Sequence, residues 1–221
     1  MGETTFEQLP EEKRSRILAV CYKEFSLHHY RTASVSRIVE EADIAKGSMY
    51  QYFDNKMALY VYLLERAGTE KLDYLRERVD IGSDFFSLLK DVVLKGAQFN
   101  LENPHKSSML YNALRETERG ELRDIALQLA GRSIDFFKEM LESAVSNGTV
   151  RETIGPDFTA FVLHQISIGL EDYLERSFGF SFEEVLREEK PVIPVEQEEL
   201  ESIIDEFVRF VRRGIGAGPA E

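Results

Sequence analysis

Polar side chains suited to contacts with phosphates and base edges lie close together in residues 34–56. Hydroxyl, amide and ammonium groups donate hydrogen bonds to phosphate oxygens, and Ser and Gln side chains also bond to base edges. Gly47 has no side chain, so the backbone around it can approach a phosphate closely. The predicted nucleic-acid contacts are Ser34, Ser36, Arg37, Lys46, Gly47, Ser48, Tyr50, Gln51, Tyr52 and Lys56.

Residue type and position divide these predicted contacts by role. A cation in the first turn of a helix opposes the helix dipole, so Lys56 indicates a phosphate partner. Aromatic residues at helical spacing are usually core, but Met49 and Phe53 already fill the inner face, so the neighbouring tyrosines are expected to offer hydroxyls. We assign phosphate contacts to Ser34, Lys46, Tyr52 and Lys56, base contacts to Ser36, Ser48 and Gln51, and either role to Tyr50.

Two short helices joined by a tight turn are needed to position these side chains. Apolar residues recur at helical spacing on one side of each helix, at Val35, Ile38, Val39 and Ala42 and again at Met49 and Phe53. The predicted turn lies at residues 42–44. This order is typical of helix-turn-helix DNA binding, although spacing alone is equally compatible with a plain helical hairpin.

Residues 10–66 resemble the tetracycline-repressor (TetR) family of bacterial regulators. The matching positions are Phe25, Tyr30, Ser34-Val35, Ile38, Ala42, Ile44, Lys46-Gly47, Met49-Tyr50, Tyr52-Phe53, Asn55-Lys56 and Leu59. The resemblance implies an all-α fold with two domains. Residues 1–55 are expected to form a three-helix helix-turn-helix DNA-binding domain, and residues 56–221 a helical domain for effector binding and dimerisation.

Four residues depart from the family pattern. His29 and Ala33 replace a usual Gly and a capping Thr, and Thr32 or Ser34 is expected to cap in place of Ala33. Asp43 replaces the usual turn Gly and tolerates the left-handed conformation better than most residues. Ala45 replaces a capping Ser, a loss that typically costs about 1 kcal/mol.

About nine helices are predicted from apolar periodicity and from residues that start or stop helices. Besides the two short helices, they span about 10–27, 56–78, 84–102, 106–117, 121–146, 157–178 and 195–213, with Asp157 as the cap of the eighth. A break is expected at 81–83. Residues 179–194 are expected to form a loop or a short helix.

The last two predicted helices are apolar on more than one side. A helix at the edge of a monomer needs only one buried face, so these two helices favour a homodimer interface. The family resemblance implies the same. Internal helices of a compact monomer remain the alternative on periodicity alone.

The family resemblance also implies an effector cavity among the middle helices. Its aromatic-rich candidate residues suit a lipophilic small molecule, although each of them is also compatible with an ordinary core position. The candidates are Phe85, Phe99, Met109, Tyr111, Asn112, Phe136, Phe137, Met140, Phe161, His164 and Gln165. Gln165, His164 and Asn112 are the first three, because each places a polar group among apolar neighbours.

The charge distribution is compatible with DNA binding at the N-terminal end. The chain has a net charge of −13, but residues 1–66 hold 9 Lys and Arg against 10 Asp and Glu, whereas residues 67–221 hold 18 against 30. Acidity is therefore concentrated away from the predicted DNA-binding segment. Because affinity for phosphates arises from local contacts, we expect binding to weaken steeply with salt.

No pattern in the sequence indicates a catalytic site, a cofactor or a metal. The four histidines lack metal-binding spacing, and no nucleophile elbow or phosphate-binding Gly loop occurs. Cys21 lies on the apolar stripe with Ile17 and Phe25, which predicts a buried, inert thiol. No segment has the length of a membrane span or the order of a secretory signal, so a cytoplasmic protein is expected.

The sequence therefore predicts a homodimeric, ligand-responsive transcriptional regulator, a repressor, that binds palindromic double-stranded operator DNA. It is not expected to be an enzyme. Two other classes remain: an all-α small-molecule binding protein or enzyme without DNA binding, and a helical interaction scaffold. Salt-sensitive affinity for DNA would separate the regulator from both.

Overall fold

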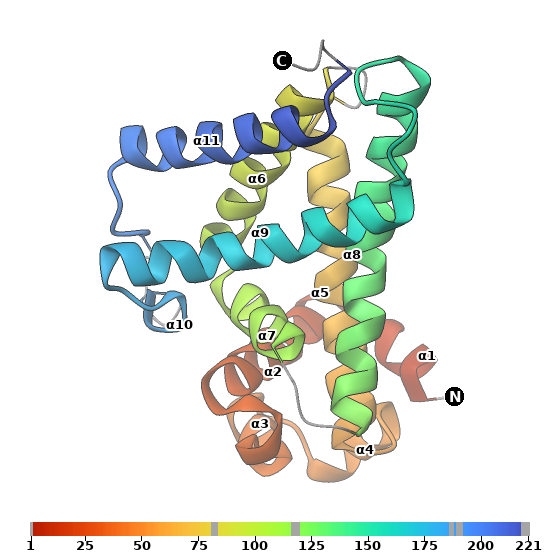
Figure 1. The fold of residues 1–221 in the computed structure, drawn as a ribbon. Helices are drawn as coiled ribbons and strands as arrows, with labels where there is room; N and C mark the ends of the chain where they lie inside the picture. The colour runs from red at the N-terminus through yellow and green to blue at the C-terminus, as the bar shows by residue number, and fades with distance from the viewer. Residues whose placement is uncertain (1, 81–83, 116–119, 186–187, 189–191, 218–221) are drawn as a thin grey trace. The chain divides into compact units, whose positions relative to one another are not determined.

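The computed structural model of the protein describes residues 2–80, 84–115, 120–185, 188 and 192–217. Within these ranges the chain forms eleven helices and no strand, which confirms the all-α fold (Figure 1). The helices are α1 (Gly2–Glu7), α2 (Glu11–Thr32), α3 (Val35–Glu41), α4 (Lys46–Tyr52), α5 (Lys56–Arg78), α6 (Phe85–Glu102), α7 (Pro104–Leu114), α8 (Glu121–Ser146), α9 (Pro156–Phe178), α10 (Phe182–Val185) and α11 (Gln197–Ile215).

Most predicted helices lie where the sequence indicated, and the differences have local causes. The helix predicted to end near residue 27 continues to Thr32, with His29 in a non-helical conformation at φ 45°. Helix α9 is preceded by Gly155, and Asp157 lies in its first turn, so the prediction of Asp157 as the cap was wrong. Asp157 instead pairs with Lys138 of α8 at 2.6 Å. The predicted break at 81–83 lies outside the described residues, as do 186–187 and 189–191 of the segment 179–194.

Two short helices lie outside the nine ranges predicted as helical, and one of them, α10, matches the short-helix alternative for its segment. Helix α10 occupies four residues of the segment for which a loop or short helix was expected. Helix α1 precedes the predicted first helix and carries Phe6, which is buried. A helix of six residues is too short for periodicity to reveal, and such a helix depends on tertiary packing for its stability.

The chain divides into two compact structural units. The first contains residues 1–69 and 103–126, and the second contains residues 70–102 and 127–221. Helices α5 and α8 each contribute residues to both units. The functional boundary expected between residues 55 and 56 stays a prediction.

The first unit is organised around the buried side of α2. Ile17, Cys21 and Phe25 are buried there at helical spacing, as predicted. Helix α7 packs on α2, helix α3 packs on both α2 and α4, and α1 packs on α4. The buried Cys21 thiol has a raised pKa because burial disfavours the thiolate and Glu24 adds a like charge, so the thiol is held in its unreactive form.

The second unit has one continuous apolar core. Residues of α6, α8, α9 and α11 supply it, and the ring pair Phe85 and Phe86 meets edge to face with centroids 5.2 Å apart. Helix α11 packs on α6 and buries Ile204, Phe207 and Val211 along one stripe. Two ion pairs tie these helices at the surface of the core, Lys90 to Asp205 and Arg212 to Asp84, at 2.5 and 3.1 Å.

Candidate nucleic-acid interface

Helices α3 and α4 are joined by the predicted tight turn. Ser34 caps α3, because its hydroxyl accepts a hydrogen bond from the backbone N–H of Arg37 at 3.4 Å. Asp43 adopts the left-handed conformation at φ 50°, and Ala42 beside it is fully buried. The backbone N–H of Ile44 then donates to the carbonyl of Val39 at 3.0 Å, which closes the turn. The helix-turn-helix prediction is confirmed.

Helix α4 lies with one side in the core and the other in solvent. Met49 and Phe53 are buried, as the i, i+4 spacing predicted. Ala45 occupies the cap position and makes no side-chain hydrogen bond. Gly47 is exposed, and a Cβ added there would meet no atom within 4 Å. The start of α4 is therefore uncovered within the first unit.

Several predicted contact residues share the outer side of α3 and α4. The Lys46 ammonium donates to the hydroxyl of Ser36 at 3.1 Å, which joins the two helices across the turn. Tyr50 and Gln51 are exposed, whereas Ser48 is only partly exposed. We call the exposed set Ser36, Lys46, Gly47, Tyr50 and Gln51 the outer face of α3–α4. It offers an ammonium, hydroxyls and an amide beside a bare backbone.

Arg37, predicted to contact DNA, binds a buried carboxylate of its own unit, and its DNA contact stays a prediction. Its Nε donates to both Glu24 oxygens at 3.0 and 3.1 Å, and its Nη2 donates to one of them at 2.6 Å. The same carboxylate accepts from the backbone N–H of Ser34 at 2.6 Å. Although burial acts to raise the pKa of Glu24, these hydrogen bonds outweigh burial and hold the pKa below its ordinary value. The carboxylate ties α2 to the start of α3.

Glu24 was missed as a functional residue, although a signal for it was present. The buried positions of α2 run through Ile17, Cys21 and Phe25, and residue 24 lies three positions after Cys21 on the same side. A charged residue on a buried stripe requires a partner, and Arg37 supplies the opposite charge.

Lys56 has an intramolecular partner that the sequence did not reveal. Its ammonium donates to the carbonyls of Tyr30 and Ala33 at 2.7 and 3.1 Å, near the end of α2, and lies 4.6 Å from the centre of the Tyr30 ring. A cation at carbonyls that end a helix is electrostatically favourable. These bonds give the cation a structural role that the sequence did not indicate, because the side chain fastens α5 to α2, and the predicted phosphate contact of Lys56 stays a prediction.

Tyr52 does not face outward as expected. Its side chain is only 7% exposed, and its ring packs on Phe6 of α1 with centroids 5.5 Å apart. Phe6 also contacts Phe53 and Tyr62, so α1 covers the inner side of α4 with a cluster of four aromatic residues. Tyr62 donates to Glu7 of α1, and its pKa is raised to about 12 by burial first and by that bond second.

The predicted effector residues belong to different environments. Phe161 is 46% exposed and Gln165 is exposed, so neither is enclosed by the described chain, and their role in effector binding stays a prediction. Met109, Tyr111 and Asn112 belong to the first unit, where Met109 is fully buried. The buried candidates of the second unit are Phe85, Phe99, Phe136, Phe137, Met140 and His164.

Two properties of the described residues bear on other functions. No group of three or more His, Cys, Asp or Glu side chains among them is placed to hold a metal ion. None of their helices combines the length and apolar character that crossing a membrane requires.

The turn geometry and the outer face of α3–α4 define a helix-turn-helix regulator, and comparison with known proteins identifies its family. Residues 17–63 match the family described as bacterial regulatory proteins, tetR family. The "Uncharacterized HTH-type transcriptional regulator YvdT" of Bacillus subtilis (strain 168) is 25% identical over 206 residues, which cover 92% of this chain and 95% of that protein.

Solved structures extend the comparison over the whole chain. A TetR family transcriptional regulator from Chloroflexus aurantiacus J-10-FL is 32% identical, with a TM-score of 0.71 and coverage of 96% of this chain and 97% of that one. The transcriptional regulator FadR from Bacillus subtilis, in complex with stearoyl-CoA, is 16% identical, with a TM-score of 0.66 and coverage of 88% and 96%. The chain belongs to the TetR family of transcriptional regulators.

Proposed function

We propose that this regulator is a cytoplasmic, homodimeric repressor that binds palindromic operator DNA through α3 and α4 and responds to a lipophilic effector. The observation that carries the proposal is the outer face of α3–α4, where exposed donors surround an uncovered Gly47. In helix-turn-helix dimers the two recognition helices enter successive major grooves about 34–36 Å apart. Residues 1–55 form the DNA-binding domain in this proposal, and residues 56–221 bind effector and partner.

The side chains of the outer face take the roles that their exposure permits. Lys46 contacts phosphate, Ser36 and Gln51 read bases, and Tyr50 does either. Arg37 and Lys56 already bind groups of the first unit, so we assign them to positioning α3 and α5 rather than to DNA contact. Ser34 and Tyr52 similarly cap and pack the two helices.

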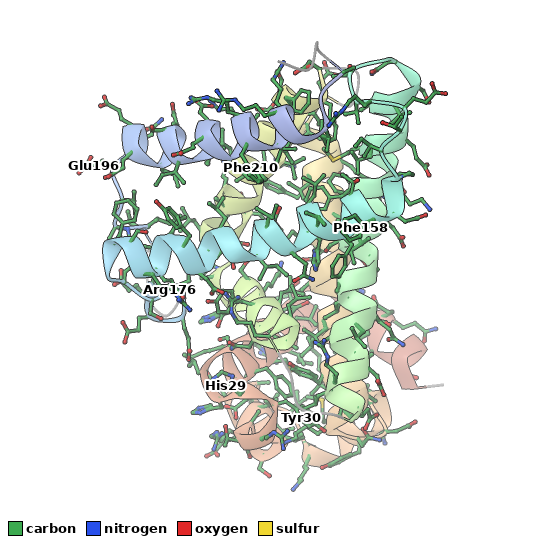
Figure 2. All side chains as sticks on the ribbon, viewed as in Figure 1. His29, Tyr30, Phe158, Arg176, Glu196 and Phe210 are labelled. Atoms are coloured by element: carbon green, nitrogen blue, oxygen red, sulfur yellow. The ribbon has the colours of Figure 1, made fainter. Side chains whose placement is uncertain are left out.

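The dimer interface proposed on α9 and α11 is supported by exposed aromatic residues. Phe158 of α9 is 74% exposed and Phe210 of α11 is 68% exposed (Figure 2), and Phe161 and Tyr173 of α9 are also exposed. Large apolar side chains clustered at a surface mark interaction sites, and a second copy of the chain covers them in this proposal.

The effector class is inferred from two sources. The second unit has an aromatic-rich core, and the structural neighbour FadR is described in complex with stearoyl-CoA. Helix α5 begins beside the DNA-binding domain and continues into the second unit, so we propose that effector binding biases its position. A ligand shifts such an equilibrium only if it binds the DNA-bound and released states with different affinity.

Selection of bound duplexes from random DNA, followed by titration of the selected duplex, tests this proposal. A palindromic site is expected, with affinity that falls at least about tenfold between 50 and 200 mM salt. Lys46→Ala is expected to weaken binding and reduce the salt dependence, while Lys95→Ala, which removes a partly exposed lysine of α6, serves as the matched control. Failure to bind any duplex at 50 mM salt would reject the proposal.

A further inference from the structure

Lys71 occupies a position of α5 where an apolar side chain is expected. Leu63, Ala67 and Leu75 are buried at intervals of four residues along this helix, and Lys71 is the remaining member of that series. Its side chain is partly buried. Placing an ammonium on a buried stripe is unfavourable unless a partner compensates the lost hydration.

The protein supplies Lys71 with only a weak partner. Its Nζ donates to the amide oxygen of Asn100 of α6 at 2.9 Å and lies 5.9 Å from the centre of the Phe99 ring. Lys71 forms no ion pair within the described part of the chain. Burial lowers the pKa of Lys71, and the charge of Glu171 on α9 opposes that shift without reversing it. An ammonium has three donors, and one neutral acceptor leaves most of its bonding capacity unused.

Two further features of the second unit are compatible with a bound ligand. Gly96 lies one turn before Asn100 on the same side of α6, and a Cβ added there would meet no atom within 4 Å. His164 of α9 is 4% exposed, and its Nε2 has no hydrogen-bond partner among the described residues. Buried polar atoms without a partner are uncommon in native proteins, and an absent ligand is one of the recognised explanations.

We propose that Lys71 and Asn100 bind the anionic group of an amphipathic effector whose apolar part packs beside Phe99. The proposal rests on the effector-responsive function above and specifies its ligand as a lipophilic anion. A carboxylate or a phosphate provides the shared chemistry, because either accepts charge-assisted hydrogen bonds from the ammonium and from the Asn100 amide after it rotates. An uncharged lipid of the same length lacks this contact.

Calorimetric titration of the full-length protein with lipids of equal chain length tests the assignment. Laurate, dodecanol and lauroyl-CoA are compared on the wild type, on Lys71→Met and on Lys95→Met. We expect Lys71→Met to weaken laurate or lauroyl-CoA about tenfold or more and to leave dodecanol within about threefold. Tighter binding of laurate would identify a carboxylate as the anionic group, and tighter binding of lauroyl-CoA would identify a phosphate. Lys95→Met is expected to behave as wild type.

The controls separate a failed anion site from a failed regulator. Lys71→Met replaces a partly buried charge by an apolar side chain of similar length, so its melting temperature is expected to equal or exceed that of the wild type. Equal weakening of all three lipids, unchanged anion binding in Lys71→Met, or no binding of any lipid would each overturn the assignment. Operator binding by the wild-type protein without lipid is measured in parallel and tests the regulator proposal independently.

Discussion

Two groups of polar side chains in the first unit differ in what they bind. Arg37 and Lys56 bond to a buried carboxylate and to the carbonyls at the end of α2, whereas Lys46 and Gln51 lie exposed on the outer face of α3–α4. All four were predicted to contact DNA. The difference separates cations that hold the recognition helices in place from side chains that remain available to a duplex.

Removal of the Glu24 carboxylate is the strongest test of the positioning group. Glu24→Gln leaves Arg37 without its counter-charge and weakens the bond to the Ser34 N–H, so we expect a loss of about 2 kcal/mol in the free energy of unfolding. This expected loss is smaller than that for breaking a fully buried ion pair. Arg37 is half exposed, so water hydrates its guanidinium once the carboxylate is removed. Urea denaturation measures the change.

Glu41→Gln is the matched control for Glu24→Gln. Glu41 pairs with Lys23 at 2.6 Å, but both side chains of that pair are about half exposed. Such surface pairs contribute roughly 0–1 kcal/mol. Equal losses in the two variants would contradict the positioning role of Glu24.

Lys46→Ala tests the exposed group and should have the opposite pattern. We expect about a tenfold loss of operator affinity at 100 mM salt, corresponding to about 1.4 kcal/mol, and a smaller slope of log affinity against log salt. The free energy of unfolding should change by less than about 0.5 kcal/mol. Fluorescence anisotropy measures the operator affinity and urea denaturation measures the free energy of unfolding of the same protein. If Lys46 had only a structural role, the loss in free energy of unfolding would exceed the loss in free energy of operator binding.

Gly47→Ala sharpens the comparison, because one substitution should move stability and DNA affinity in different directions. The added Cβ meets no atom within 4 Å in the free protein, and Ala in a helix is up to about 1 kcal/mol more favourable than Gly. If the backbone at this position approaches a phosphate, the same methyl group weakens operator binding severalfold. A rise in melting temperature with unchanged DNA affinity would remove Gly47 from the interface.

Local patterns in the sequence were sufficient for the helix-turn-helix and insufficient for its supports. The stripe through Ile38 and Ala42 predicted α3 and its turn because its periodicity is local. The partners of Arg37 and Lys56 come from α2, across a separation in sequence that periodicity does not encode. The buried side of Tyr52 depends on Phe6, which belongs to a helix too short to predict.

The second unit shows the same limit in a different form. Helix α9 is apolar on several sides, so its sequence does not tell which side faces the core. Phe161 and Gln165 were therefore expected inside and are exposed, while His164 beside them is buried. Lys71 gives no comparable signal in the sequence, because a lysine within a helix usually indicates a solvent-facing side.

The smallest expected effect is a change in how the free energy of unfolding depends on pH. Two buried groups with lowered pKa values, His164 and Glu24, contribute to this dependence in different pH ranges. Burial lowers the pKa of His164, so the folded state binds this proton less readily than the unfolded state does. The free energy of unfolding therefore rises with pH from the folded-state pKa up to about 6.5 and is reduced on acidification through that window. The lowered pKa of Glu24 makes the free energy of unfolding depend on pH only below about pH 4.5. Glu24 therefore does not contribute to the change in that free energy between pH 7.5 and 5.5.

His164→Leu isolates this contribution. Burial and the charge of Lys23 also lower the pKa of His105, but that group is present in both proteins and cancels in the comparison. We expect the loss of unfolding free energy between pH 7.5 and 5.5, measured by urea denaturation, to be smaller in His164→Leu than in the wild type. Equal losses would mean that His164 takes up its proton in the folded state as readily as in the unfolded chain, which its burial among apolar neighbours argues against.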